Sequence, residues 1–209
     1  MRADVSLRRL QRHELLDLAQ DRVPRALLGR VELQALPPAF VARRALDQLQ
    51  AGVDPGWCAT FLMLRSDDGQ VLGSCGFKHA PDVDGVVEIG YGVAPGCQRQ
   101  GVASQGVQAL CALALRSTEV RQVLACISPD NQASMALARK LGFTAGLSLL
   151  DAEGEHVVAW TLTRQSRLAQ AGGAPAEPPP KGTTSPTSPP GPAGPAGPTA
   201  PAGAGHAGR

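Results

Sequence analysis

The chain has 209 residues, of which 43% are hydrophobic, and its 20 basic and 18 acidic side chains leave a formal net charge of +2. This composition is typical of a globular protein with one domain and an appendage, and it indicates neither a nucleic-acid partner nor a membrane-surface partner. No apolar run approaches the roughly 18 residues of a membrane span, and the N-terminus lacks the apolar core of a signal peptide, so we expect a cytoplasmic protein.

The first half of the chain predicts one strand, two helices and then a meander of strands. Residues 1–10 form the expected strand, and apolar side chains at helical spacing predict a helix over residues 11–29, broken near Pro24, and another over residues 37–51. Alternating patterns and tight turns then predict three successive strands. These strands cover residues 57–65, 71–78 and 86–93, which makes the sheet at least half antiparallel.

The third of these strands leads into a loop suited to an anion. One face of the strand is apolar, and the other carries Glu88 beside two glycines. Pro95 has no backbone N–H and ends the strand, and an uncharged helix is predicted over residues 102–115. The N-terminus of such a helix exposes unpaired N–H groups and a partial positive charge, which suits a pyrophosphate. Taken alone, the same residues also fit an ordinary strand, turn and helix.

The rest of the domain is predicted to contain a strand over residues 122–128, a helix capped by Asp130 or Asn131, and a hairpin over residues 143–164. If the strand over residues 122–128 lies beside the strand over residues 86–93, the helix between them makes a parallel crossover.

The C-terminal part of the chain has a different composition. Of the 18 prolines, 11 lie beyond Gln170, and no Leu, Ile, Val, Phe or Met follows Leu168. Such a segment cannot bury a core. We therefore expect a folded domain over residues 1–165 and a disordered tail over residues 166–209.

Cysteine and histidine patterns give no indication of a metal site. The five cysteines form no Cys-x-x-Cys pair, and the four histidines form no His-Glu-x-x-His motif. We expect the cysteines to be small buried residues, and His79 to be a solvated or hydrogen-bonded structural histidine.

The chain contains four short motifs in order: Val93-Ala94-Pro95, Gln98-x-x-Gly101-x-Ala103, Asn131-x-x-Ser134 and Lys140-Leu141-Gly142-Phe143. Together these motifs resemble the GCN5-related N-acetyltransferase (GNAT) superfamily, and most of all the branch similar to ribosomal-protein alanine N-acetyltransferases. The resemblance covers about residues 3–164. It implies an α/β (α+β) acyl-CoA N-acyltransferase fold. This fold has a twisted, mostly antiparallel mixed sheet with a splayed central parallel pair, flanked by helices.

The resemblance also implies acetyl-CoA as the acyl donor, bound between the strands over residues 86–93 and 122–128. Backbone groups of Tyr91, Gly92 and Val93 would pair with the pantetheine arm. The pyrophosphate would lie on the amides of Gln98, Arg99, Gln100, Gly101, Val102 and Ala103. The Arg99 side chain either adds a cation there or is solvated. Asn131 corresponds to an asparagine that contacts the cofactor, or it only caps its helix.

An amine that attacks a thioester must lose a proton, and the departing thiolate benefits from a proton donor. Glu88 is the candidate base, directly or through water, and the alternative is a solvent-facing strand glutamate. Ser134 matches a serine near the thioester sulfur in the resembling branch, and the alternative is a plain residue of the first helical turn. Many family members use a tyrosine as the acid, but Ala138 occupies that place here, and the only tyrosine is Tyr91.

The leading hypothesis is an N-acetyltransferase whose partner is an amine acceptor: a protein N-terminus, a polyamine or another small molecule. We expect the two helices over residues 11–29 and 37–51 to flank the acceptor cleft, and these helices and the hairpin tips to set which acceptor binds. We expect a monomer or a homodimer. The alternatives are a non-catalytic acyl-CoA-binding module and an interaction protein tethered by its tail.

Overall fold

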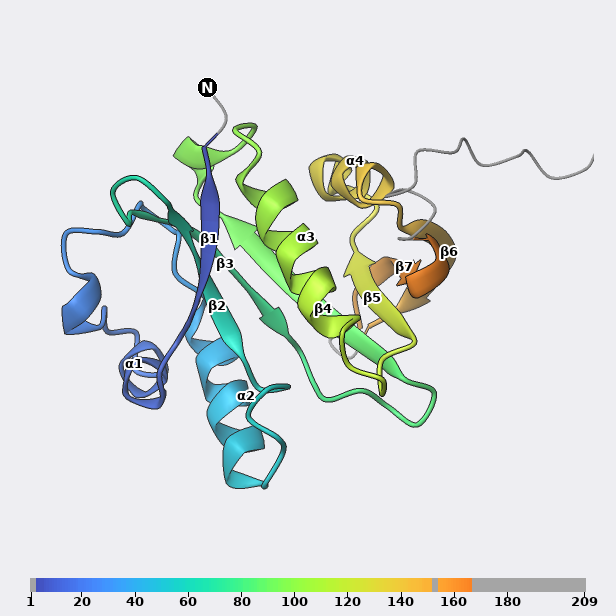
Figure 1. The fold of residues 1–209 in the computed structure, drawn as a ribbon, viewed down its shortest axis with the longest axis horizontal. Helices are drawn as coiled ribbons and strands as arrows, with labels where there is room; N and C mark the ends of the chain where they lie inside the picture. Colours follow the sequence, from blue (N-terminus) through green and yellow to red (C-terminus); the bar gives the residue numbers. More distant parts are fainter. Residues whose placement is uncertain (1–2, 152–153, 167–209) are drawn as a thin grey trace, which may run out of the picture. The chain divides into compact units, whose positions relative to one another are not determined.

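The computed structural model describes residues 3–151 and 154–166, so the predicted tail lies outside the described residues except for Ser166. The described residues form one seven-stranded sheet in the order β1-β2-β3-β4-β5-β7-β6, flanked by helices (Figure 1). The strands are β1 Val5–Arg9, β2 Thr60–Arg65, β3 Val71–Phe77, β4 Val86–Val93, β5 Gln122–Ile127, β6 Thr144–Leu150 and β7 His156–Thr163. The helices are α1 Arg12–Leu18, α2 Ala39–Gln50, α3 Val102–Ala114 and α4 Gln132–Lys140, with short 3-10 turns at Arg25–Leu27 and Pro95–Cys97.

The central strands β4 and β5 are the parallel pair of this sheet, and the other neighbouring strands pair antiparallel. The parallel register covers Val86 to Glu88 against Gln122 to Leu124, although β4 continues to Val93. The two strands therefore separate after Glu88. This arrangement confirms the predicted mixed sheet with a splayed central pair.

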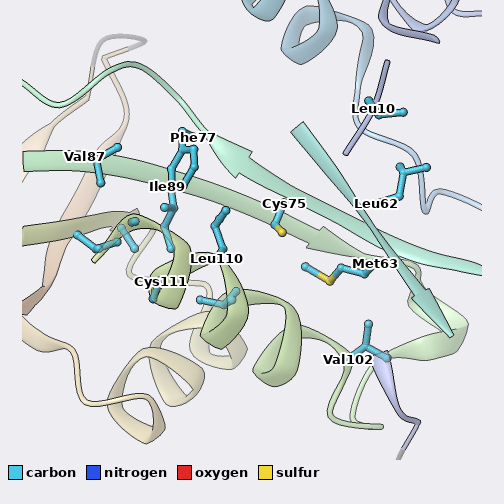
Figure 2. Close-up of a cluster of buried hydrophobic side chains, with 14 of the residues drawn as sticks. Leu10, Leu62, Met63, Cys75, Phe77, Val87, Ile89, Val102, Leu110 and Cys111 are labelled. Atoms are coloured by element: carbon cyan, nitrogen blue, oxygen red, sulfur yellow. The ribbon is translucent and has the colours of Figure 1, made fainter. Parts of the chain in front are cut away.

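Helix α3 packs across β1, β3 and β4 (Figure 1) and carries the core contacts that its uncharged sequence predicts. Leu110 and Cys111 lie in one buried cluster with Cys75 and Ile89 of the sheet (Figure 2). A Cβ at Gly106 would lie 2.6 Å from the Met63 sulfur, so this glycine permits the close approach of α3 to β2. The helix is thereby fixed at the carboxyl end of β4.

The helix predicted over residues 11–29 is wrong in its second half. Helix α1 ends at Leu18, the chain turns at Asp21 with a φ of 57°, and Pro24 leads only into a short 3-10 turn. Val23 stands at a helical interval in the sequence, but it is half exposed to solvent. The apolar spacing was therefore partly fortuitous.

The cysteines agree with their predicted role, because all five are free and four of them are buried.

None of the helices in residues 3–151 and 154–166 combines the length and the apolar character that a membrane-crossing helix needs.

Candidate active site

The separation of β4 from β5 leaves one edge of β4 without a partner strand. The Lys78 N–H donates to the Glu88 carbonyl at 2.8 Å, and the Ala94 N–H donates to the Leu72 carbonyl at 2.9 Å. Because alternate residues of a strand bond to opposite sides, residues 88, 90, 92 and 94 bond towards β3. The N–H and C=O groups of Tyr91 and Val93 therefore point into the gap. The backbone of Gly92, which the sequence placed with them, points to β3.

The loop after β4 brings the predicted anion-binding residues to the N-terminus of α3. Gly101 is the N-cap of this helix at a φ of 85°, and no side chain caps the first turn. Arg99 also has a positive φ, of 61°, and its side chain is exposed. The Gln98 Nε2 donates to the Val93 carbonyl at 3.3 Å and so connects the loop to the open edge of β4. Exposed N–H groups with the positive end of a helix dipole fit an anionic group.

Glu88 lies near the point where β4 and β5 separate, and it is not a freely solvated residue. Its side chain is 14% exposed, with Oε1 2.6 Å from the Lys78 Nζ and Oε2 3.8 Å from the His79 Nε2. Burial alone would raise the pKa of Glu88. The neighbouring His79 and the ion pair with Lys78 outweigh burial and lower this pKa to about 2. Glu88 is therefore an ionised carboxylate at neutral pH.

His79 and Lys78 were not predicted as members of this site. The His79 Nδ1 lies 2.8 Å from the Ala80 carbonyl oxygen, and the neighbouring Glu88 carboxylate raises the pKa of His79 despite partial burial. The expected hydrogen-bonded histidine is thus present, but beside the candidate base. The sequence does contain a signal for both residues, namely the turn over residues 81–85. This turn fixes the antiparallel register of the two strands, and that register places Lys78 opposite Glu88.

Ser134 lies at the start of α4, where Asn131 is the helix cap. The Asn131 Oδ1 accepts a hydrogen bond from the Ser134 N–H at 3.0 Å. Burial raises the pKa of Tyr91, and a hydrogen bond with the Ser134 side chain opposes this shift only in part. The hydroxyls of Tyr91 and Ser134 are therefore together in the structure, whereas the sequence assigned Tyr91 only a backbone role. Ala138 is buried in the core cluster.

A cleft of about 620 Å³ opens between the sheet and the first half of α2. Its lining includes Phe40 and Arg44 from α2, Lys78, and the glycines Gly90 and Gly92 of β4. Tyr91, Val93 and Gln98 also border it, so the cleft adjoins the edge and loop described above. Both first helices were expected to flank such a cleft. Helix α2 and the segment before it line this one, while α1 packs against α2.

Among the described residues, no group of three or more His, Cys, Asp or Glu side chains could hold a metal ion.

The family model described as "Acetyltransferase (GNAT) domain" matches residues 5–144.

Two curated relatives match part of the chain. The uncharacterized N-acetyltransferase YjdG of Bacillus subtilis (strain 168) is 30% identical over 97 residues, which are 46% of this chain and 56% of YjdG. The uncharacterized N-acetyltransferase p20 of Bacillus licheniformis is 30% identical over 88 residues, which are 42% of this chain and 49% of p20. The matched part of the chain thus spans about half the length of these relatives.

Solved structures resemble the fold over most of the chain. The aminoglycoside acetyltransferase AAC(6')-Ib in complex with coenzyme A is 20% identical, with a TM-score of 0.58 over 80% of this chain and 99% of that one. RimL, a ribosomal L7/L12 alpha-N-protein acetyltransferase in complex with coenzyme A, is 21% identical, with a TM-score of 0.56 over 78% and 95%. Mutant forms of the spermidine/spermine N-acetyltransferase SpeG from Vibrio cholerae are 13% identical, with a TM-score of 0.58 over 80% and 98%. These likenesses show the fold.

Proposed function

The chain belongs to the acetyltransferase (GNAT) family, and from this premise we propose that it moves an acetyl group from acetyl-CoA to a primary amine. The observation that carries the proposal is the open edge of β4, which leads directly to the uncapped N-terminus of α3. An extended amide chain can pair with such an edge, and a pyrophosphate can accept bonds from such a helix start. Both shapes occur in coenzyme A, and the solved relatives include complexes with it.

The proposed binding residues follow from this fit. Tyr91 and Val93 offer backbone groups to the pantetheine arm, and the amides of residues 98–103 hold the pyrophosphate. Arg99 adds a positive charge at the loop. Asn131 keeps its capping bond and contacts the cofactor beside the start of α4.

Acetyl-CoA, when bound, supplies a thioester carbon that an amine can attack. The amine nitrogen forms the new C–N bond as the C–S bond breaks, and the sulfur leaves with the electron pair of that bond. The amine loses a proton, and Glu88 with its neighbour His79 directs this proton away through water. The hydroxyl of Ser134, held by Tyr91, donates a proton to the departing sulfur.

We also propose that residues 1–165 form the transferase domain and that residues 166–209 are a separate tail. The last described strand ends at Thr163, which supports a boundary near this point. A chain ending at Ser166 should bind coenzyme A as tightly as the full chain. If it lost only the capture of a protein partner, the tail would be a tether.

The test is acetyl-CoA consumption with release of free thiol over a panel of primary amines. We expect turnover with at least one amine and an acetylated product of 42 Da added mass, roughly the mass of an acetyl group less one hydrogen. Tight binding of coenzyme A without turnover on any amine would instead indicate a non-catalytic acyl-CoA-binding module.

A further inference from the structure

We propose that Lys78 is an acetylation site of the chain itself. Its Nζ takes the acetyl group from the acetyl-CoA that the same molecule binds, and the modification removes the ion pair between Lys78 and Glu88. This inference rests on the proposed function, because that function supplies the acetyl donor. It gives Lys78 a role beyond that of a charged neighbour of Glu88.

The backbone of Lys78 is fixed between two elements. Its N–H donates to the Glu88 carbonyl of β4 at 2.8 Å, and its own carbonyl accepts a hydrogen bond from the Gln48 Nε2 of α2 at 2.8 Å. These two bonds hold the chain directly after β3 in place. The side chain of Lys78 therefore starts from a defined point beside β4.

The side chain of Lys78 crosses β4 towards Glu88. Its Cε lies 3.9 Å from the position that a Cβ at Gly90 would occupy, and its Nζ lies 2.6 Å from the Glu88 Oε1. Because Gly90 has no side chain, the lysine stem can lie over the strand at this position. The Lys78 side chain is 32% exposed and lines the cleft, so its amine is accessible to a bound reactant.

The proposed direction of the cofactor brings its acyl end towards this amine. With the pyrophosphate on the loop over residues 98–103, the pantetheine arm runs back along Val93 and Tyr91 towards Glu88. Tyr91 and Glu88 are three residues apart, which is about 10 Å along a strand. Glu88 is also the last residue of β4 that pairs with β5. The acyl end thus approaches the place where the gap between the two strands closes, and the Lys78 Nζ lies beside this place.

The chemistry is that of the proposed reaction, with Lys78 as the acceptor. The Nζ forms a bond to the thioester carbon, and the C–S bond breaks with its electron pair moving to the sulfur. The Lys78 ammonium loses two protons in this step. One passes to water beside Glu88 and His79, and the other ends on the departing thiol. The products are acetylated Lys78 and free coenzyme A.

Acetylation changes the environment of Glu88. A neutral amide replaces the ammonium, so Glu88 loses its ion pair but stays largely buried. Burial raises the pKa of Glu88, and Lys78 is one of the groups that oppose this effect. His79 from the turn after β3 and Cys126 from β5 still face the carboxylate. The pKa of Glu88 is therefore higher in the acetylated chain than in the unmodified chain.

The chain contains its own controls, because it has only three lysines, Lys78, Lys140 and Lys181. The full chain is incubated with isotope-labelled acetyl-CoA without an added amine, and the label on each lysine is followed by peptide mass spectrometry. Lys140 is exposed at the end of α4, so it reports uncatalysed acetylation. We expect Lys78 to be labelled at least about tenfold faster than Lys140, because bound acetyl-CoA is held close to it.

Two controls show whether the label on Lys78 comes from the bound cofactor of the same molecule. Excess unlabelled coenzyme A should suppress the labelling of Lys78 and leave that of Lys140 unchanged, because it occupies the cofactor site. Dilution of the chain should not change the fraction of Lys78 labelled per unit time. Lys140→Arg is the matched variant, and its Lys78 should be labelled as fast as in the parent chain.

A pair of variants tests the loss of the ion pair without any transfer. Lys78→Gln imitates the neutral acetylated side chain, and Lys78→Arg keeps the positive charge. Titration of the Glu88 carboxyl by NMR should give a higher pKa in Lys78→Gln than in Lys78→Arg. Equal pKa values in the two variants would overturn the proposed coupling between the modification and Glu88.

The labelling outcomes separate this inference from the proposed function. Labelled Lys78 without acetylation of any added amine would leave the inference standing and overturn transfer to a separate acceptor. Acetylation of an added amine with Lys78 unlabelled would do the reverse. Equal labelling of Lys78 and Lys140, or labelling of Lys78 that excess coenzyme A does not suppress, would overturn the inference as well.

Discussion

The arrangement around Glu88 determines what this residue can do in the reaction. Lys78 and His79 both approach its carboxylate, and together they lower its pKa to about 2 although burial acts in the opposite direction. A carboxylate with so low a pKa takes up a proton poorly at neutral pH. We therefore propose that Glu88 acts as a fixed negative charge that orients the amine and the water beside it.

Replacing Glu88 with glutamine removes this charge and nearly preserves the shape. We expect Glu88→Gln to lower kcat by at least about a hundredfold, because the amine loses its orienting charge and its proton path. Coenzyme A affinity should stay within about threefold. Steady-state kinetics and a coenzyme A titration measure the two effects separately. An unchanged kcat would remove Glu88 from the mechanism.

His79 should make the stability of the chain depend on pH. The neighbouring Glu88 carboxylate raises the pKa of His79 in the folded state above the usual value of about 6.5. The stabilisation is thus fully present below pH 6 and is lost as the pH rises through the folded pKa. We expect His79→Gln to lower the free energy of unfolding more at pH 5.5 than at pH 9, as urea denaturation would show.

The control is His156→Gln, because His156 is an exposed residue at the first position of β7. Its effect should be small at both pH values. A loss of stability in His79→Gln that is equal at pH 5.5 and pH 9 would contradict the proposed pairing with Glu88.

Some residues of the candidate site could be predicted from the sequence, and others could not. Strand alternation placed Glu88 on the face opposite the apolar core, and the loop motif placed Gly101 at the start of α3, where its φ of 85° suits glycine. The partners Lys78 and His79 were missed, because they depend on the register between two strands. The contact of Tyr91 with Ser134 was missed because it joins residues far apart in the chain.

Among the elements, α4 carries a residue with two proposed roles. Asn131 caps the helix, and it is also the proposed cofactor contact. Asn131→Ala should lower the free energy of unfolding by about 1 kcal/mol, because the Ser134 N–H loses its acceptor. Asn131→Ser should keep the cap and the stability but reduce coenzyme A affinity. Thermal unfolding and a coenzyme A titration separate the two roles, and full affinity in the serine variant would leave Asn131 as a cap only.

Helix α3 fixes the loop over residues 98–101, the proposed pyrophosphate site, by its packing. Leu110 is fully buried, and Leu110→Ala should lower the free energy of unfolding by about 2–5 kcal/mol. Leu113 on the same helix is 40% exposed, so Leu113→Ala should cost less than about 1 kcal/mol. Urea denaturation checks both. Equal losses in the two variants would contradict the assignment of the buried face.

The sequence predicted those helices and strands that have a clear apolar or glycine and proline pattern. It failed where a turn of the chain ended a helix early. The uncharged composition of residues 102–115 identified α3, and the glycine and proline signals identified the hairpins. The helix over residues 11–29 was overextended, because a positive φ at Asp21 and the turn before Pro24 ended it early. The close contact of Gly106 with Met63 follows only from tertiary packing.

At the scale of the whole molecule, the family motifs were sufficient to predict the mixed sheet and the gap between its two central strands. They were not sufficient for the cleft, whose lining combines α2, β3 and β4 from distant parts of the chain. The glycines Gly90 and Gly92 of its lining could be read from the sequence, but the open space above them appears only in the structure.

The most direct test of the account is acetyl transfer itself. The full chain is incubated with isotope-labelled acetyl-CoA and a peptide with a free N-terminus, and thiol release and the mass of the peptide are followed together. We expect one labelled acetyl group on the α-amine for each thiol released, and at least about a hundredfold slower transfer with Glu88→Gln. Tight binding of coenzyme A with no labelled peptide or other amine at any pH between about 6 and 9 would contradict the account.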